Sequence, residues 1–332
     1  MAHFDLPLEK LREYRPDLPV PDDLEAFWQG TIAQARSRGG EVRSEKVDNR
    51  LRLIDTYDVT YPGFDGQPVK AWLHVPAGAT GPLPTVAQYI GYSGGRGFPF
   101  GNTLYAQAGF AQLIMDSRGQ SYSGGGWEVT PDHWEGPGVN QAPGQMTRGI
   151  LDPQTYYYRR AYTDAVRLLD AAAELPQCDA SRMVVLGGSQ GGGLAIAAAG
   201  LGALAGHSLL GSAPDVPFLC HFPRAITLVN SQPYGEIVRY LAGFRDQVEP
   251  VLRTLSYFDG AILGRYATAP TIFSVGLMDQ TCPPSTCFAA YNWYGDGKVE
   301  DKTVEVYPFN EHEGGADHHR QKVLDWLHQH LA

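Results

Sequence analysis

Two stretches of the chain share the spacing Gly-x-Ser-x-Gly, in which a serine can act as a nucleophile. The first is Gly91-Tyr92-Ser93-Gly94-Gly95, and the second is Gly187-Gly188-Ser189-Gln190-Gly191. Such a serine needs a tight turn between a strand and a helix, and glycines on both sides let backbone atoms approach closely there. Because the chain holds 39 glycines, chance matches are expected, and the spacing alone does not select one serine.

The residues around the second stretch meet this requirement. Residues 183–186 form an apolar run typical of a buried strand, and the small residues at 192–197 favour a tightly packed helix. After Ser93, residues 96–100 include a proline and cannot begin a helix directly behind the serine. The sequence therefore predicts Ser189 as the nucleophile. The alternative is that Ser189 is only part of a glycine-rich turn.

The first stretch is predicted to take a different part in the same chemistry. Attack on a carbonyl produces a negatively charged oxygen, which backbone N–H groups can stabilise. In hydrolases with this type of turn, one N–H follows an early strand and the other belongs to the residue after the nucleophile. Tyr92 follows the predicted strand 84–90, and Gln190 follows Ser189. We predict that Tyr92 and Gln190 form this oxyanion hole, with a packed loop aromatic as the alternative for Tyr92.

A serine nucleophile needs a base, and in this type of hydrolase a histidine follows the acid along the chain. His312 comes after the predicted strand 303–307 and before the last helix, which places it on a loop at the sheet edge where Ser189 lies. We therefore predict His312 as the general base. Both His207 and His221 come too early in the chain. Four later histidines are interpreted as surface residues of the last helix: His318, His319, His328 and His330.

An acid is needed to hold the histidine in the correct tautomer. Asp279 ends a mostly apolar run at residues 271–278, so its carboxylate is expected at the same sheet edge as Ser189 and His312. Asp259 is a rival, but it lies before that strand. We predict that Asp279 accepts the Nδ1 proton of His312 and stabilises the imidazolium. Two later carboxylates are interpreted as solvated turn residues: Asp296 and Asp301.

The elements that must position these residues follow from the hydrophobic pattern. An N-terminal extension, residues 1–50, is expected to be helical, with a helix from residues 21–23 to about residue 38. An antiparallel strand pair is expected next, at residues 51–61 and 69–75. Further strands are predicted at 84–90, 111–116, 182–186, 208–211, 271–275 and 303–307, and helices at 103–108, at 156–174, after Ser189, and at 316–330. This alternation predicts an α/β class protein with an α/β-hydrolase fold, a mostly parallel central sheet with helices on both faces, in a single domain over residues 1–332.

Composition narrows the class of protein further. The net charge of −10 and the pI near 5.4 argue against a nucleic-acid partner, which requires a basic surface. The longest run of small and apolar residues, 194–206, is too short to cross a membrane. No secretory signal pattern is visible at the N-terminus. We therefore expect a cytoplasmic protein with no nucleic-acid partner and no membrane partner.

The cysteines and histidines show no pattern typical of a metal site. Four cysteines are scattered through the chain without a Cys-x-x-Cys pair: Cys178, Cys220, Cys282 and Cys287. A chain of this length does not need disulfides, so we expect reduced, partly buried thiols, with a bridge between Cys282 and Cys287 as the alternative. The cluster of His312, His318 and His319 lacks a matching cysteine pair, so no metal site is predicted.

Three motifs in a fitting order resemble those of carbohydrate esterase family 7, the acetyl xylan esterases and cephalosporin C deacetylases. Arg118-Gly119-Gln120 follows Asp116-Ser117, Gly-x-Ser-Gln-Gly stands at residues 187–191, and His312-Glu313 comes near the end. Residues 147–152 and 156–159 also resemble the family's stretch before its long helix. The resemblance covers nearly the whole chain.

The resemblance implies removal of acetyl groups from small substrates, including short xylo-oligosaccharides and cephalosporin C, without a metal or organic cofactor. It also implies a homo-oligomer, a hexamer built as a dimer of trimers with the active sites facing an internal cavity. The resemblance implies a catalytic triad of Ser189, Asp279 and His312. It implies an oxyanion hole formed by Tyr92 and Gln190. The implied motif that shapes the neighbouring loops is Arg118, Gly119 and Gln120.

One part of the chain departs from the family's pattern. The loop over residues 121–145 is rich in glycine and tryptophan, with Trp127, Asp132-His133-Trp134-Glu135 and Gly136-Pro137-Gly138. We expect this loop to contact the pocket or a subunit interface and so to shift substrate preference. Two alternative functions stay open: an α/β-hydrolase acting on longer-chain esters or peptides, and a binding protein without catalysis. The presence of all three predicted triad residues counts against the second.

Overall fold

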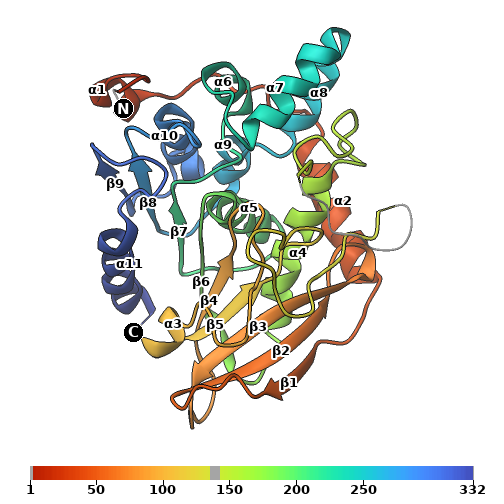
Figure 1. Ribbon diagram of the computed structural model, residues 1–332, viewed down its shortest axis with the longest axis vertical. Helices are drawn as coiled ribbons and strands as arrows, with labels where there is room; N and C mark the ends of the chain where they lie inside the picture. Colours follow the sequence, from red (N-terminus) through yellow and green to blue (C-terminus); the bar gives the residue numbers. More distant parts are fainter. Residues whose placement is uncertain (1–2, 135–142, 332) are drawn as a thin grey trace.

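The computed structural model describes residues 3–134 and 143–331, and a nine-stranded mixed sheet runs through this part of the chain (Figure 1). The spatial order is β1-β2-β3-β5-β4-β6-β7-β8-β9. The strands from β1 to β5 in this order pair antiparallel, and those from β5 to β9 pair parallel. The strands are β1 (Arg43–Val47), β2 (Ile54–Pro62), β3 (Pro68–Pro76), β4 (Leu83–Tyr89), β5 (Ala111–Met115), β6 (Cys178–Gly188), β7 (Gly211–Asp215), β8 (Thr271–Gly276) and β9 (Lys302–Tyr307). The predicted fold class is confirmed.

Helices cover both faces of the sheet, as the alternating pattern predicts. The larger core joins one face to α2, α4 and α5, and a smaller core joins the other face to α3 and α11 (Figure 1). The helices are α1 (Leu8–Glu13), α2 (Leu24–Ser37), α3 (Leu104–Gln107), α4 (Tyr157–Ala172), α5 (Gln190–Leu204), α6 (Phe222–Leu228), α7 (Tyr234–Gly243), α8 (Val248–Ser256), α9 (Gly260–Leu263), α10 (Pro284–Trp293) and α11 (Ala316–Leu331). No helix in this described part of the chain is long and apolar enough to cross a membrane.

The central helix α5 is buried along most of its length and starts directly after Ser189. Its glycines allow neighbouring backbone to come very close. A β-carbon on Gly193 would lie 2.3 Å from the Phe218 carbonyl oxygen, and one on Gly200 would lie 2.1 Å from that of Leu263. Larger residues would therefore push the segments after β7 away from the helix. The small-residue run predicted as a packed helix serves this close approach.

The N-terminal extension contains more than the predicted helix. The predicted helix corresponds to α2, and a short helix, α1, precedes it. After α2 the chain forms β1, which pairs antiparallel with β2 and is mostly exposed. Charged residues predominate in β1, which is typical of an edge strand that must not pair with other chains. Because β1 is almost entirely polar, it lacks the alternation of apolar and polar residues by which a strand is recognised in a sequence.

The prediction of a strand at residues 208–211 is wrong. The strand, β7, begins at Gly211 and ends at Asp215. The apolar pair Leu209 and Leu210 favoured a strand that starts too early. Pro214 lies inside the observed strand, and because proline is normally disfavoured there, the sequence did not indicate a strand at this position. Between β7 and β8 the chain forms α6 to α9, which the sequence analysis did not predict.

Candidate active site

Ser189 lies on a tight turn between β6 and α5. Its backbone angles are φ 57° and ψ −120°, a strained conformation for a residue with a side chain. A β-carbon on Gly187 would lie 2.5 Å from the Tyr89 carbonyl oxygen, and one on Gly191 would lie 2.2 Å from the same oxygen. The flanking glycines are therefore required because the end of β4 presses against the turn. The strand–turn–helix arrangement is the one the sequence predicts.

Three side chains from separate loops form a hydrogen-bonded chain at this turn. His312 Nε2 lies 3.0 Å from Ser189 Oγ, and His312 Nδ1 lies 2.8 Å from Asp279 Oδ2. The other carboxylate oxygen, Oδ1, accepts the backbone N–H groups of Thr281 and Cys282 at 2.8 and 2.9 Å. The Asp279 side chain is 1% exposed and that of His312 is 34% exposed. The carboxylate is thus held rigidly beneath an imidazole that can be reached from outside.

The sheet explains why these residues meet. Ser189 follows β6, Asp279 follows β8 and His312 follows β9. These strands belong to the parallel part of the sheet, so their carboxyl ends lie at one edge. A serine, an imidazole and a carboxylate in this order can carry out acyl transfer, because the imidazole can take the serine proton while the carboxylate stabilises the resulting positive charge.

The loop after β4 packs directly against the serine. A β-carbon on Gly91 would lie 3.7 Å from the Gly188 carbonyl oxygen and 3.9 Å from Ser189 Cβ. On the other side, Gln190 is the first residue of α5, and the N–H groups of a first helical turn have no acceptor within the helix. The N–H groups of Tyr92 and Gln190 therefore belong to the two segments that meet at Ser189, where the predicted oxyanion hole requires them.

The side chain of Gln120 joins these two segments. Its Oε1 accepts the Ser93 N–H at 2.7 Å, and its Nε2 donates to Gln190 Oε1 at 2.9 Å. The same Nε2 donates to the Tyr157 hydroxyl at 2.9 Å, and the Tyr158 hydroxyl donates to Gln190 Oε1 at 2.9 Å. The sequence motif predicted only that Gln120 shapes loops near the site. The two tyrosines were not predicted as members of the site, although the family motif contains them.

Arg118, two residues before Gln120, joins the same loop to α4. It is buried, and its guanidinium makes a bidentate pair with Asp164 on α4. Arg118 also lies 3.5 Å from Asp132, which pairs with Arg148 and Arg160 as well. Burial alone would raise the pKa of Asp132, but these guanidinium groups lower it to about 2. A fully charged network therefore ties the loop that contains Asp132 to α4. The third motif residue, Gly119, has φ 68° and donates its N–H to Thr130 at 2.8 Å.

The far end of the glycine- and tryptophan-rich loop reaches the predicted oxyanion segment. The Tyr92 hydroxyl contacts Gln145 Oε1 at 2.9 Å and Glu236 Oε1 at 2.6 Å. Burial and the neighbouring Glu236 carboxylate raise the pKa of Tyr92, so the hydroxyl keeps its proton and can donate. Trp127 is exposed. The predicted loop residues Glu135 and Gly136-Pro137-Gly138 lie outside the described residues.

One histidine prediction is wrong. His319 is 1% exposed, with Nδ1 3.3 Å from the Tyr307 hydroxyl and Nε2 4.0 Å from an Asp215 carboxylate oxygen. It lies on the face of α11 that packs on the sheet, together with Val323 and Leu327. This burial lowers the pKa of His319. His318 and His328 are exposed, as predicted, and His330 is half-buried.

The rival carboxylate and the cysteines have structural surroundings. Asp259 accepts backbone N–H groups from His221, Phe222 and Ala261 at 2.7 to 2.9 Å and caps α9. The four cysteines are unbridged and buried. All four thiols are buried more deeply than the partly buried thiols that the sequence predicted.

Comparison with known families decides between the esterases and the other hydrolases of this fold. The family model for acetyl xylan esterase (AXE1) matches residues 1–330. The chain belongs to the acetyl xylan esterase family. The resemblance found in the motifs is thereby confirmed, and this acetyl xylan esterase family member is a carboxylic ester hydrolase.

Solved structures of acetyl xylan esterases are similar over nearly the whole chain. The enzyme from Paenibacillus sp. R4 is 39% identical, with a TM-score of 0.88, and the match covers 98% of this chain and 100% of that one. Acetyl xylan esterase 1 from Thermoanaerobacterium sp. JW/SL YS485 is 31% identical, with a TM-score of 0.83, over 97% and 99% of the two chains. The acetyl esterase Axe7A of Xylanibacter ruminicola is 26% identical over 94% of this chain and 68% of its own length.

The contacts of Gln120 predict a measurable effect in this acetyl xylan esterase family member. Replacing Gln120 with alanine is expected to lower kcat for an acetyl ester by about 10- to 100-fold, because Ser93 and Gln190 lose their common partner and the N–H groups beside them shift. KM is expected to change less than kcat. Gln120→Glu keeps the acceptor for the Ser93 N–H and loses the donor to Gln190. Its kcat should therefore lie between that of the wild type and that of Gln120→Ala. Equal losses for both variants, with kcat tracking a lowered Tm, would point to a purely structural role.

Proposed function

We propose that the protein is a serine esterase that removes acetyl groups from small acetylated substrates, including xylo-oligosaccharides and cephalosporin C. One observation carries this proposal: the hydrogen-bonded chain from Ser189 through His312 to Asp279, in a chain of the acetyl xylan esterase family. The Paenibacillus and Thermoanaerobacterium relatives are named as acetyl xylan esterases, which supports an acetylated sugar as the substrate.

In the proposed mechanism His312 takes the proton of Ser189 as Oγ attacks the acetyl carbonyl carbon. The oxygen that becomes negatively charged is stabilised by the N–H groups of Tyr92 and Gln190. The imidazolium, held by Asp279, then gives its proton to the departing alcohol and leaves an acetyl group on Ser189. A water molecule, deprotonated by His312, attacks this acetyl-enzyme and releases acetate.

A panel of substrates tests the proposed specificity. We expect the chain to hydrolyse acetylated xylose, acetylated xylobiose, cephalosporin C and p-nitrophenyl acetate, and to act more slowly on polymeric acetylated xylan. For p-nitrophenyl esters, kcat/KM is expected to be about 100-fold higher with acetyl than with octanoyl, because a site for acetyl has little room for further methylenes. A preference for octanoyl would support the longer-chain alternative, and cleavage of acyl-peptides would support a peptidase.

We also propose that the protein assembles as a hexamer, a dimer of trimers, with the active sites facing an internal cavity. The support is the resemblance to carbohydrate esterase family 7, which implies this assembly, together with the match to the acetyl xylan esterase family. Light scattering of the purified protein is expected to give a mass six times that of the 36.3 kDa chain. A mass equal to that of one chain or two chains would contradict the proposal, and would also remove the size limit that the cavity sets on substrates.

A further inference from the structure

A small polar pocket lies behind the proposed nucleophile, on the face of the sheet that packs against α3 and α11. Its volume is about 150 Å³. Five elements line it, with Gln88 of β4, Gly188 of β6, Asp215 of β7, Tyr105 of α3 and Arg320 of α11. Apolar residues of the smaller core complete its walls. The lining includes no member of the proposed triad or oxyanion hole. We call this cavity the α3–α11 pocket.

The pocket exists because the middle one of three neighbouring strands ends in a glycine. In the parallel register Gln88 lies beside Leu186, and Gly188 lies beside Asp215. Side chains alternate along a strand, so Gln88, Gly188 and Asp215 face the same side of the sheet. Among the described residues, a β-carbon on Gly188 would meet only the Asp215 carboxylate, at 3.7 Å, so the turn itself does not require glycine there. The missing side chain leaves the space between Gln88 and Asp215 open.

Three polar groups of the lining have an atom without a partner within residues 3–134 and 143–331. Tyr105 is 8% exposed, and its hydroxyl makes no hydrogen bond with these residues. The Gln88 side chain accepts at Oε1 from Gln112 at 2.7 Å, whereas its Nε2 donates to none of them. The Asp215 carboxylate accepts the Ser274 hydroxyl at Oδ1 and leaves Oδ2 unpaired. None of the three atoms is sealed from solvent, so the pocket offers two donors and an acceptor to a ligand.

The charges at the pocket favour a neutral ligand. Arg320 pairs with Asp317 through Nη1, and its other N–H groups have no partner in the described part of the chain. His319 stays neutral because burial lowers its pKa. Burial and the Asp215 carboxylate raise the pKa of Tyr105, so its hydroxyl keeps its proton and can donate. An anion would be repelled by Asp215 and a cation by Arg320, whereas an uncharged hydroxyl group can both donate and accept.

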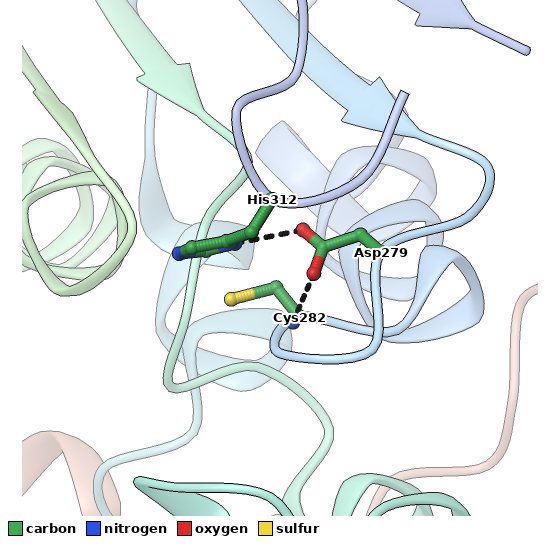
Figure 2. Close-up of side chains that lie close together, drawn as sticks. All are labelled: Asp279, Cys282 and His312. Atoms are coloured by element: carbon green, nitrogen blue, oxygen red, sulfur yellow. Dashed lines mark hydrogen bonds and ion pairs between the residues drawn. The ribbon is translucent and has the colours of Figure 1, made fainter. Parts of the chain in front are cut away.

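The pocket is open to solvent and separate from the triad side chains. The side chain of Asp215 is 30% exposed and that of Arg320 is 59% exposed, so a small molecule can enter on their side. The imidazole of His312 is directed instead at the Asp279 carboxylate (Figure 2). The pocket nevertheless adjoins the catalytic turn, because the Asp215 carbonyl oxygen accepts the Ser189 N–H at 2.9 Å. A ligand in the pocket would therefore lie next to this turn without contacting the triad side chains.

We propose that the α3–α11 pocket is a binding site for a small neutral polyol. Its hydroxyl groups donate to Asp215 Oδ2 and accept from Gln88 Nε2 and from the Tyr105 hydroxyl. An engineered apolar cavity of about 150 Å³ holds benzene, so this pocket has room for a polyol of similar size, such as glycerol. The site goes beyond the proposed esterase function, and binding at it does not depend on that function.

Binding of glycerol to two tyrosine variants tests the site. Tyr105→Phe removes a hydroxyl that has no protein partner, so its Tm should stay that of the wild type. Its Kd for glycerol, from a saturation-transfer NMR titration of the full-length protein, is expected to rise at least about fivefold, as for the loss of one hydrogen bond. Tyr266→Phe is the matched control: this half-buried tyrosine also has a hydroxyl without a partner in the described part of the chain, but it lies outside the pocket. Equal Kd values for the two variants overturn the proposal, as does a wild type that does not bind glycerol.

Two further variants test the place of binding. Gly188→Val is expected to fill the pocket and abolish glycerol binding in a protein that stays folded, as its melting curve would show. Glycerol binding retained by the folded Gly188→Val protein overturns the proposal. Ser189→Ala is expected to keep the Kd of the wild type, whatever its esterase activity, because Ser189 does not line the pocket. A loss of binding in Ser189→Ala would mean that glycerol binds at the catalytic site instead.

Charged probes test the class of ligand. Sodium acetate supplies a small anion and methylammonium chloride a small cation, and both are expected to bind the pocket more weakly than glycerol because of Asp215 and Arg320. If either ion bound the wild type more tightly than glycerol and lost affinity in Tyr105→Phe, the pocket would take an ion and the polyol assignment would be wrong.

Discussion

Replacing Ser189 with alanine is expected to lower kcat for p-nitrophenyl acetate by about 10⁴- to 10⁶-fold while the protein stays folded. The hydroxyl lies 3.0 Å from His312 Nε2, and the proposed mechanism has no other nucleophile to form the acetyl-enzyme. Alanine keeps the β-carbon, so the strained backbone at φ 57° is neither relieved nor made worse. The measurement is kcat beside a thermal melting curve, in which Tm should stay close to that of the wild type.

The first Gly-x-Ser-x-Gly stretch, residues 91–95, supplies a control for Ser189 with the same motif spacing but another place in the fold. Ser93 also has a positive φ, 69°, but it lies on the loop after β4, and its backbone N–H is bound by Gln120. Ser93→Ala is expected to keep kcat within about tenfold of the wild type, because its hydroxyl takes no part in acyl transfer. If Ser189→Ala retained full turnover, or if Ser93→Ala abolished it, the assignment of the nucleophile would be wrong.

The proposed triad was predictable because each of its residues follows a strand that the sequence marks clearly. The apolar runs before Ser189 and Asp279 became β6 and β8, and the strand before His312 became β9. In a parallel sheet these positions share one edge, so chain order alone brings the three together. Glycine spacing added the turn geometry at Ser189, where a β-carbon on either side would collide with β4. Local pattern and topology were sufficient here.

Other features depend on contacts that no local pattern records. Gln120 meets Gln190 across 70 positions of the chain, and the motif that contains Gln120 gave no hint of its partner. Cys282 approaches His312 only because two loops fold together at the sheet edge. The burial of His319 had a visible signal in the sequence. It shares a helical face with Val323, four residues along, and this spacing was not applied to the histidines of α11.

Asp279 is expected to show the second-largest effect. Asp279→Asn is nearly isosteric, and the amide oxygen can still accept the N–H groups of Thr281 and Cys282. The amide nitrogen, however, would donate toward His312 Nδ1 and favour the tautomer whose proton lies on Nε2. That proton points at Ser189 and blocks the base, so kcat for p-nitrophenyl acetate should fall by about 10³- to 10⁴-fold with Tm little changed.

The rival carboxylate gives the matched control for Asp279. Asp259 is also buried and also accepts several backbone N–H groups, from His221, Phe222 and Ala261, but it caps a helix. Asp259→Asn replaces an acceptor of three hydrogen bonds by a group whose nitrogen can only donate, so it should lower Tm by destabilising the segment before β8. The protein that remains folded should keep its kcat. If Asp259→Asn lost kcat while Asp279→Asn turned over normally, the roles of the two carboxylates would be exchanged. If both variants lost kcat with equal falls in Tm, neither carboxylate would act in the reaction itself.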